Sequence, residues 1–183
     1  TSDAATVRDS LVNAVQAADI IEEQIAFTKE YELIGSENPI WQNPSAVLDA
    51  TLREVHMDGV VITNSLDPGL EVYSDPMLRK VLFNLLDNAL RHGERVSKIQ
   101  VSARSHGDDL LIVWEDNGVG IAQDDKDLIF ERGFGKNSGL GMFLAREILS
   151  ITGITIRETG EPGRGARFEI RVPRGVHRTA GRA

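Results

Sequence analysis

Residues 84–92 read Asn84-Leu85-Leu86-Asp87-Asn88-Ala89-Leu90-Arg91-His92. Asn84 and Asn88 are four residues apart, so both amides lie on one side of a helix, one turn from each other. The helix is predicted to begin at Asp75-Pro76, where an N-cap acid precedes a proline at the first helical position. It is predicted to run to about residue 92 and to end at Gly93. Its apolar face comprises Leu78, Val81, Leu82, Leu85 and Ala89.

The polar face of this helix suits a nucleotide and its metal ion. Mg²⁺ prefers oxygen ligands and keeps several waters, so one or two protein oxygens can complete a shell that phosphates otherwise supply. The Asn88 carbonyl oxygen is the candidate ligand, and Arg91 is the candidate phosphate contact. An isolated Asn pair at this spacing is far more often a solvated helix face, so the segment needs support from elsewhere in the chain.

A second cluster, Asp116-Asn117-Gly118-Val119-Gly120, follows a predicted buried strand at 110–114. A carboxylate at a strand end can accept a hydrogen bond from an exocyclic amine such as that of adenine. Gly118 and Gly120 would let the backbone approach a flat ring without side-chain obstruction. The alternative is an ordinary Asp-Asn-Gly turn.

A third cluster, Gly139-Leu140-Gly141-Met142, opens a helix predicted at 140–152. Its backbone N–H groups and its dipole favour a phosphate. Lys136 and Ser138 lie just upstream and could close on the terminal phosphates. The P-loop pattern is absent, because the lysine is followed by Asn137 rather than by Ser or Thr, and no Gly-x-Gly-x-x-Gly follows a strand at dinucleotide spacing.

In this order, the three clusters resemble the ATP-binding domain shared by sensor histidine kinases, DNA gyrase, Hsp90 and MutL, known as the Bergerat or GHKL fold. The kinase branch resembles the chain most closely, and the resemblance covers roughly 45–173. The matching segments are the N box at 84–92, the first Gly-rich box at 116–121, the F box at 129–134, the second Gly-rich box at 138–142 and the closing Gly-rich segment at 163–168.

The resemblance implies ATP and Mg²⁺ as cofactors, with Asn88 as the metal ligand and residues 121–138 as a mobile lid. It implies catalytic roles for Asn84, Asn88, Arg91 and Lys136. Asp87 is an alternative candidate for a base, or a solvated residue. The implied nucleotide-binding residues are Asn84, Asn88, Arg91, His92, Asp116, Gly118, Gly120, Ile121, Phe130, Lys136, Ser138, Gly139, Leu140, Gly141 and Met142.

The chain departs from the kinase pattern in three ways. Ala166 stands where the family often has a threonine near the adenine, and the lid is short. A phosphoacceptor motif is also missing: His56 is followed by Met57, and the other histidines, at 92, 106 and 177, fall in the pocket, a turn and the tail. The resemblance therefore implies a kinase fragment that transfers the γ-phosphate to a histidine on a bundle helix outside this chain, with a response regulator as a further partner.

Two other functions remain open from the sequence. One is an ATPase of the wider fold, although those relatives usually carry a glutamate at the position of Asn84. The other is a non-catalytic module that binds nucleotide or dimerises. The resemblance implies a cytoplasmic domain, on a parent protein that is either soluble or membrane-anchored.

The predicted fold class is α+β, a two-layer sandwich of a mixed, mostly antiparallel sheet covered by about three helices, at 45–56, 76–92 and 140–152. A long amphipathic helix at 7–34 precedes it and could form a homodimer, because its apolar residues recur at intervals of three and four. Predicted domains are 1–36 (part of a dimerisation-type helix), 37–173 (the ATP-binding domain) and 174–183 (a basic, frayed tail). The connector at 36–44 is predicted to be turn-rich, and Ser45 to cap the first covering helix. The predicted strands lie at 60–63, 70–73, 99–103, 110–114, 154–159 and 166–172.

Composition excludes several classes of function. The 183 residues suffice for one domain plus an appendage, and the net charge of −8 argues against a nucleic-acid or membrane-surface binder. The sequence shows neither a bilayer-spanning apolar run nor a signal peptide. With no cysteine in the chain, disulfides, thiolate catalysis and cysteine-ligated zinc are excluded. The four histidines show no metal-ligand spacing.

Overall fold

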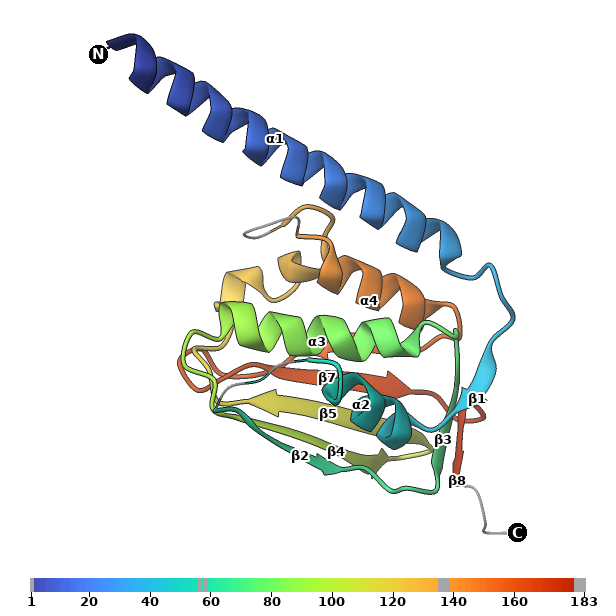
Figure 1. The fold of residues 1–183 in the computed structure, drawn as a ribbon. Helices are drawn as coiled ribbons and strands as arrows, with labels where there is room; N and C mark the ends of the chain where they lie inside the picture. The colour runs from blue at the N-terminus through green and yellow to red at the C-terminus, as the bar shows by residue number, and fades with distance from the viewer. Residues whose placement is uncertain (1, 56, 58, 135–138, 180–183) are drawn as a thin grey trace.

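The computed structural model describes residues 2–55, 57, 59–134 and 139–179. Its main sheet has five strands in the order β2-β4-β5-β7-β6 (Figure 1). The first pair, β2 with β4, is parallel, and the other neighbours are antiparallel. The mixed, mostly antiparallel sheet predicted from the alternating sequence pattern is thus confirmed. The strands are β2 (Val61–Ser65), β4 (Lys98–His106), β5 (Asp109–Asp116), β6 (Thr155–Glu158) and β7 (Arg167–Val172).

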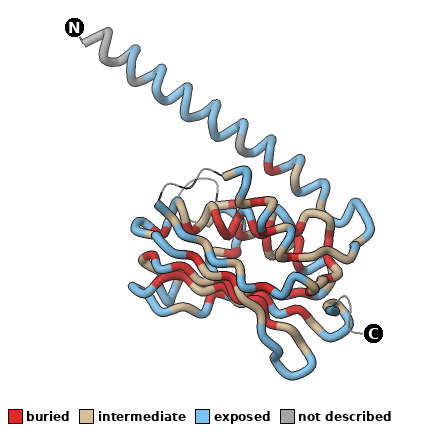
Figure 2. Tube along the Cα trace, turned by 60° about the horizontal axis from the view of Figure 1, so that its bottom comes forward, coloured by how far each residue is buried: buried red, intermediate tan, exposed pale blue. Residues whose placement is uncertain are grey.

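Three helices cover one face of this sheet, as predicted (Figure 1). They are α2 (Pro44–Leu52), α3 (Leu78–His92) and α4 (Gly141–Ser150). Trp114 and Phe168 from the strands meet Leu85 and Ile148 from the helices in one buried cluster. Figure 2 shows this buried layer between the helices and the sheet. Burial of such side chains is the main driving force for folding.

The helix boundaries differ from the prediction at their N-termini. Asn43, rather than Ser45, caps α2: its side chain accepts a hydrogen bond from the Ala46 N–H at 2.9 Å, and Pro44 takes the first helical position. The helix α3 begins at Leu78, because Asp75 and the following proline form a turn before it. The Asp75 carboxylate still accepts a backbone N–H at this end, from Met77 at 2.8 Å.

A second, three-stranded sheet was not predicted. Its order is β1 (Ile40–Gln42), β3 (Leu70–Ser74) and β8 (His177–Thr179). The expectation of a frayed tail from residue 174 is therefore wrong for 177–179, which pair with β3. Arg178 holds the tail against this sheet, because it forms an ion pair with Glu71 at 2.6 Å and its guanidinium lies over the Trp41 ring, 4.1 Å from the centroid.

The helix α1 (Ser2–Leu33) is longer than predicted and extends away from the sandwich (Figure 1). Gly35 follows it with φ +69°, and its N–H donates to Asp75 at 2.9 Å. Phe27 is buried near the C-terminal end of α1, whereas the large apolar residues of its earlier turns are exposed. Within the part of the chain that the structure describes, no helix is long and apolar enough to cross a membrane. The exposed apolar residues of α1 include Val7, Leu11, Val12, Val15, Ile20, Ile21 and Ile25.

Candidate nucleotide-binding site

A cavity of about 380 Å³ lies between the second half of α3, the end of β5 and the start of α4. The three sequence clusters, separated by up to about fifty residues in the chain, converge on it. This volume is in the range of small-molecule sites. The predicted nucleotide-binding residues that line the cavity are Asn84, Asn88, Arg91, His92, Asp116, Gly120, Ile121, Gly139, Leu140, Gly141 and Met142.

Asn84 joins two walls of this cavity. Its side chain is buried, and its Nδ2 donates to the Gly141 carbonyl at 2.7 Å. An unpaired buried amide would be costly, so this bond fixes the start of α4 against α3. The sequence suggested a polar residue facing a ligand, but it gave no indication of this backbone partner, which lies 57 residues away.

Asn88 and Arg91 lie further along α3. Arg91 pairs with Asp87 at 2.6 Å, four residues earlier, and its side chain is 60% exposed. This solvated pairing leaves the guanidinium able to exchange Asp87 for a phosphate, since exposed pairs of this kind are worth little. Among the described residues, no hydrogen bond occupies the half-buried amide of Asn88.

Asp116 is a buried carboxylate at the end of β5. Its Oδ1 accepts from the Gly118 N–H at 2.9 Å and from the Ala166 N–H at 3.0 Å. Burial raises the pKa of this carboxyl, the two N–H donors lower it in part, and nearby Glu158 raises it. Among the described residues, no donor reaches the second oxygen, Oδ2, so it is available as an acceptor in the cavity.

The glycines of the first Gly-rich box, Gly118 and Gly120, allow close contact with neighbouring backbone segments. Gly118 does not line the cavity among the described residues; a Cβ there would come within 2.7 Å of the Gly93 carbonyl oxygen. Gly120 has φ +71°, and a Cβ would meet the Gly165 carbonyl oxygen at 2.9 Å. Contact with a flat ring was the predicted reason for both glycines, whereas the structure shows close backbone packing at each.

The start of α4 presents backbone donors to the cavity. Leu140 occupies the N-cap position without a side-chain cap, so the first N–H groups of the helix have no such partner. Gly139 has φ +60°, and a Cβ would lie 2.3 Å from the Phe134 carbonyl oxygen. This turn therefore requires glycine and exposes a helix N-terminus that suits an anion.

Besides Gly118, three predicted residues are not found in the described wall. Phe130 packs edge-on against Phe168 in the core, with ring centroids 6.4 Å apart, and its neighbour Ile129 lines the cavity instead. Phe130 is thus a core residue, and it lies in a short 3₁₀ turn, η2 (Leu128–Phe130). Lys136 and Ser138 lie outside the described residues, as does His56.

The N-terminal helix supplies a wall that the sequence did not predict. Ala26, Phe27 and Glu30 from α1 line the cavity together with Lys80 from α3. Glu30 and Lys80 form an ion pair at 2.7 Å. Phe27 packs with Leu140 and Leu144. The recurrence of apolar residues at intervals of three and four indicated an apolar face on α1, but it could not show which part of that face would dock on the domain.

The donors present fit a magnesium ion that is held mainly by phosphate. Among the residues described, no group of three or more His, Asp or Glu side chains could hold a metal by itself. Mg²⁺ in nucleotide sites commonly uses one or two protein oxygens and keeps waters and phosphates for the rest. The Asn88 amide oxygen and the cavity beside it meet that requirement.

The family model described as Histidine kinase-, DNA gyrase B-, and HSP90-like ATPase matches residues 74–176, and the chain belongs to this family. Within the family, it is the catalytic ATP-binding domain of a two-component sensor histidine kinase. The alginate biosynthesis sensor protein KinB of Pseudomonas aeruginosa is 42% identical over 101 residues, which are 52% of this chain and 17% of KinB. The signal transduction histidine-protein kinase ArlS of Staphylococcus aureus is 28% identical over 130 residues, 66% of this chain and 29% of ArlS.

Solved structures agree with the fold. The ATP-binding domain of PrrB from Mycobacterium tuberculosis matches with a TM-score of 0.59 and 26% identity, covering 75% of this chain and 98% of that one. Full-length ShkA in complex with AMPPNP matches with a TM-score of 0.71 and 21% identity, covering 93% of this chain and 39% of ShkA. The ShkA likeness concerns the fold alone. The chain spans only a minor part of KinB and ArlS.

Proposed function

We infer that this chain binds Mg²⁺-ATP in the cavity and transfers the γ-phosphate to a histidine on a bundle helix outside the chain. The observation that carries this inference is the convergence of Asn88, Asp116 and the α4 N-terminus on one cavity. A hard-metal ligand, an acceptor for an amine and an anion-binding helix end are the three contacts that a nucleotide triphosphate needs.

Each contact has an assigned partner on the nucleotide. The free Oδ2 of Asp116 accepts from the adenine amine, and the Asn88 amide oxygen binds Mg²⁺, which neutralises phosphate charge. The α4 N–H groups and Arg91 hold the phosphates, joined by Lys136 from the lid. Asn84 acts through Gly141, whose carbonyl it holds at 2.7 Å, and so keeps the α4 N-terminus in place.

Catalysis by these residues is mainly positioning and charge neutralisation. Phosphoryl transfer has a loose transition state with charge spread over the equatorial oxygens, so preorganised N–H donors and cations stabilise it. Fixing the γ-phosphate at the α4 N-terminus also lowers the entropic barrier to attack by an incoming imidazole. Positioning and charge neutralisation account for the transfer without Asp87 acting as a base.

Hydrolysis is the weaker alternative. A hydrolase of this fold needs an acidic side chain to orient water, and Asn84 occupies that position with its amide bonded to Gly141. A module that only dimerises would not need Asn88 and Arg91 in the cavity wall, and the transfer assay distinguishes a kinase from a non-catalytic nucleotide-binding module. The partners we infer are the histidine-bearing helix of the parent kinase, a response regulator and a second copy of the chain through residues 7–34. The setting is the cytoplasm, where ATP is available.

The test is calorimetric titration with a non-hydrolysable ATP analogue, with and without Mg²⁺. We expect Mg²⁺-dependent binding by the wild-type chain and loss of that dependence in Asn88→Ala, with the fold unchanged by circular dichroism. Phosphate transfer from labelled ATP to a supplied histidine-bearing bundle helix is measured next. A folded wild-type chain that binds no nucleotide, or an Asn88→Ala variant with unchanged Mg²⁺ dependence, would contradict the assignment.

A further inference from the structure

A buried ion pair outside the phosphate site lies close to Asp116. Lys126 follows the 3₁₀ turn η1 (Gln123–Asp125), and its ammonium contacts Glu158 Oε2 at the end of β6 and the Gly160 carbonyl. The Glu158 side chain is 0% exposed and that of Lys126 is 10% exposed. Taking two charges out of water is costly, so a pair in this environment needs further compensating bonds.

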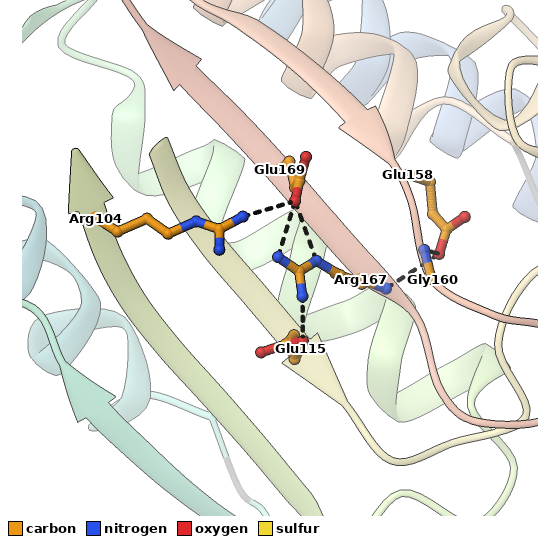
Figure 3. A network of polar contacts seen from close by, with 6 residues as sticks. All are labelled: Arg104, Glu115, Glu158, Gly160, Arg167 and Glu169. Atoms are coloured by element: carbon orange, nitrogen blue, oxygen red, sulfur yellow. Dashed lines mark hydrogen bonds and ion pairs between the residues drawn. The ribbon is translucent and has the colours of Figure 1, made fainter. Parts of the chain in front are cut away.

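Glu158 has those bonds, and they organise the turn between β6 and β7. Its Oε1 accepts from the backbone N–H groups of Gly160 and Arg167, each at 3.0 Å (Figure 3). A Cβ at Gly160 would come within 2.7 Å of the same oxygen, so the close approach requires glycine. One carboxylate therefore bridges the two ends of the turn, and Lys126 neutralises it.

The same turn orients Asp116. Its last residue before β7, Ala166, donates its N–H to Asp116 Oδ1 at 3.0 Å. Gly165 packs so closely that a Cβ would overlap the Asp116 carbonyl, and Gly163 N–H donates to Val119 O at 2.7 Å. The position of the carboxylate that faces the cavity thus depends on the turn that Glu158 and Lys126 hold.

Charge, as well as geometry, links the Lys126–Glu158 pair to Asp116. Glu158 raises the pKa of the Asp116 carboxyl in addition to the effect of burial, while the backbone donors lower it. Among the described residues, the other charged or titratable groups that line the two hollows containing Asp116 are Glu30, Lys80, Asp87, Arg91 and His92 in the cavity, and Glu115, Glu161, Arg164, Arg167 and Glu169 in a second, polar hollow. Lys126 is the ammonium in direct contact with Glu158.

We propose that Lys126 is a positioning residue for recognition of the nucleotide base: it neutralises Glu158, thereby holds the β6–β7 turn that orients Asp116, and reduces the repulsion between the two carboxylates. The proposal rests on the inferred role of Asp116 toward the adenine amine. An apolar pair of similar volume would often serve stability equally well. The charges at 126 and 158 therefore call for a role beyond packing, and the adjacent acceptor supplies it.

The test compares binding of a non-hydrolysable ATP analogue with Mg²⁺ over a series of pH values. Protonation would place a hydrogen on the free Oδ2 and make it a poorer acceptor for the amine, so wild-type affinity falls as pH drops through the pKa of Asp116. In Lys126→Met, an unneutralised Glu158 moves that midpoint to higher pH. The double variant Lys126→Met/Glu158→Gln restores the midpoint to the wild-type value or below. Lys98→Met, which changes an exposed lysine of β4, is the matched control and leaves the midpoint unchanged.

The carboxyl signal of Asp116 in a ¹³C NMR titration gives a readout that does not depend on nucleotide. It shifts to higher pH in Lys126→Met and to lower pH in Glu158→Gln. Should Lys126→Met fail to fold, Glu158→Gln and the double variant carry the test. An Asp116 titration in Lys126→Met that matches wild type overturns the proposal; if that variant does not fold, an Asp116 titration in Glu158→Gln that matches wild type does so. A wild-type chain that titrates as expected but binds no nucleotide overturns the proposed function instead.

Discussion

Asp116 is a residue in which stability and function make opposite demands. Its pKa is raised from the ordinary value of 3.8, chiefly by burial, so the folded state disfavours the charged form. The stability associated with this group is therefore complete below pH 3.8 and is lost as pH rises through the raised pKa. The proposed contact with an amine uses the charged form, which burial disfavours, and the free Oδ2 lies at the cavity.

We predict that Asp116→Asn separates these two demands. The Asn Oδ1 can still accept from the Gly118 and Ala166 N–H groups, while an NH₂ group replaces the free Oδ2. Thermal unfolding near pH 7 should show equal or higher stability than wild type, and the loss of stability above pH 3.8 should become smaller. Affinity for ATP should fall about tenfold or more, the size expected for replacing a buried acceptor with a donor.

The control for this prediction is Asp108→Asn, which changes an exposed acid in the turn between β4 and β5. It should alter neither the pH dependence nor the nucleotide affinity. Calorimetry with ATP and GTP distinguishes the roles: a loss confined to ATP supports adenine recognition. Equal losses for both nucleotides would mean that Asp116 does not contact the base.

Asn84 and Asn88 provide a matched pair on a single helix. Asn84→Ala removes the bond to the Gly141 carbonyl and leaves that acceptor buried, so we predict a loss of about 1–3 kcal/mol in the free energy of unfolding. Asn88→Ala should change stability by less than about 0.5 kcal/mol, as half-exposed polar sites usually do. Urea denaturation measures both, and a larger loss in Asn88→Ala would contradict the assignment of Asn84 as the link between α3 and α4.

At the scale of elements, the sequence predicted those helices and strands whose formation depends on residues close together in the chain. The interior of α3 and the strands β4 and β5 carry long periodic patterns, and the structure has them where expected. The strands β1 and β8 have three residues each, and they exist because both pair with β3 from distant parts of the chain. No window of three residues contains that information, so the tail at 177–179 resembled a frayed end.

The candidate site shows the same division. Glycine boxes and the Asn-x-x-x-Asn spacing predicted about half of the described residues that line the cavity. Glu158 acts on Asp116 from 42 residues further along the chain, and Phe27 lines the cavity with residues more than fifty positions away. The motifs do not encode such long-range contacts. Phe130 followed a motif as well, yet its ring fills the core beside Phe168.

The docking of α1 depends on a few side chains, and Phe27→Ala should weaken it. Phe27 is 6% exposed and packs with Leu140 and Leu144. Removing a buried Phe ring costs about 3–5 kcal/mol in a closed core; this small cluster beside an open cavity should lose less. Hydrogen exchange should quicken in residues 27–34 while the strands keep their protection.

Ile21→Ala is the control for α1 docking, because Ile21 is 58% exposed on the same helix. Its exchange pattern should match that of wild type. Unchanged protection of 27–34 in Phe27→Ala would show that the Glu30–Lys80 ion pair and the other contacts suffice to hold α1 on the domain.

The whole molecule combines a closed sandwich with a helix that is only partly covered. The helix α1 extends beyond the domain and exposes apolar side chains between Val7 and Ile25, whereas its last turns contact the nucleotide cavity (Figures 1 and 2). An exposed apolar row on a long helix is typical of a helix–helix interface. The inferred homodimer through residues 7–34 would cover this row, which lies on the part of α1 before the cavity-lining Ala26, Phe27 and Glu30.

We predict that the chain self-associates through this row and that Leu11→Glu/Val15→Glu prevents it. These two residues are 62% and 60% exposed, are one turn apart and do not line the cavity. Two glutamates buried in an apolar helix interface are strongly unfavourable because their carboxylates lose hydration there. Sedimentation velocity over a range of concentrations should show a wild-type dimer and a monomeric double variant with the same ATP affinity. Gln16→Glu adds charge at an exposed polar position and should leave the dimer intact. A wild-type chain that stays monomeric at every concentration would mean that α1 requires a different helix to cover its apolar row, and ATP binding in the cavity would then be a property of the single domain.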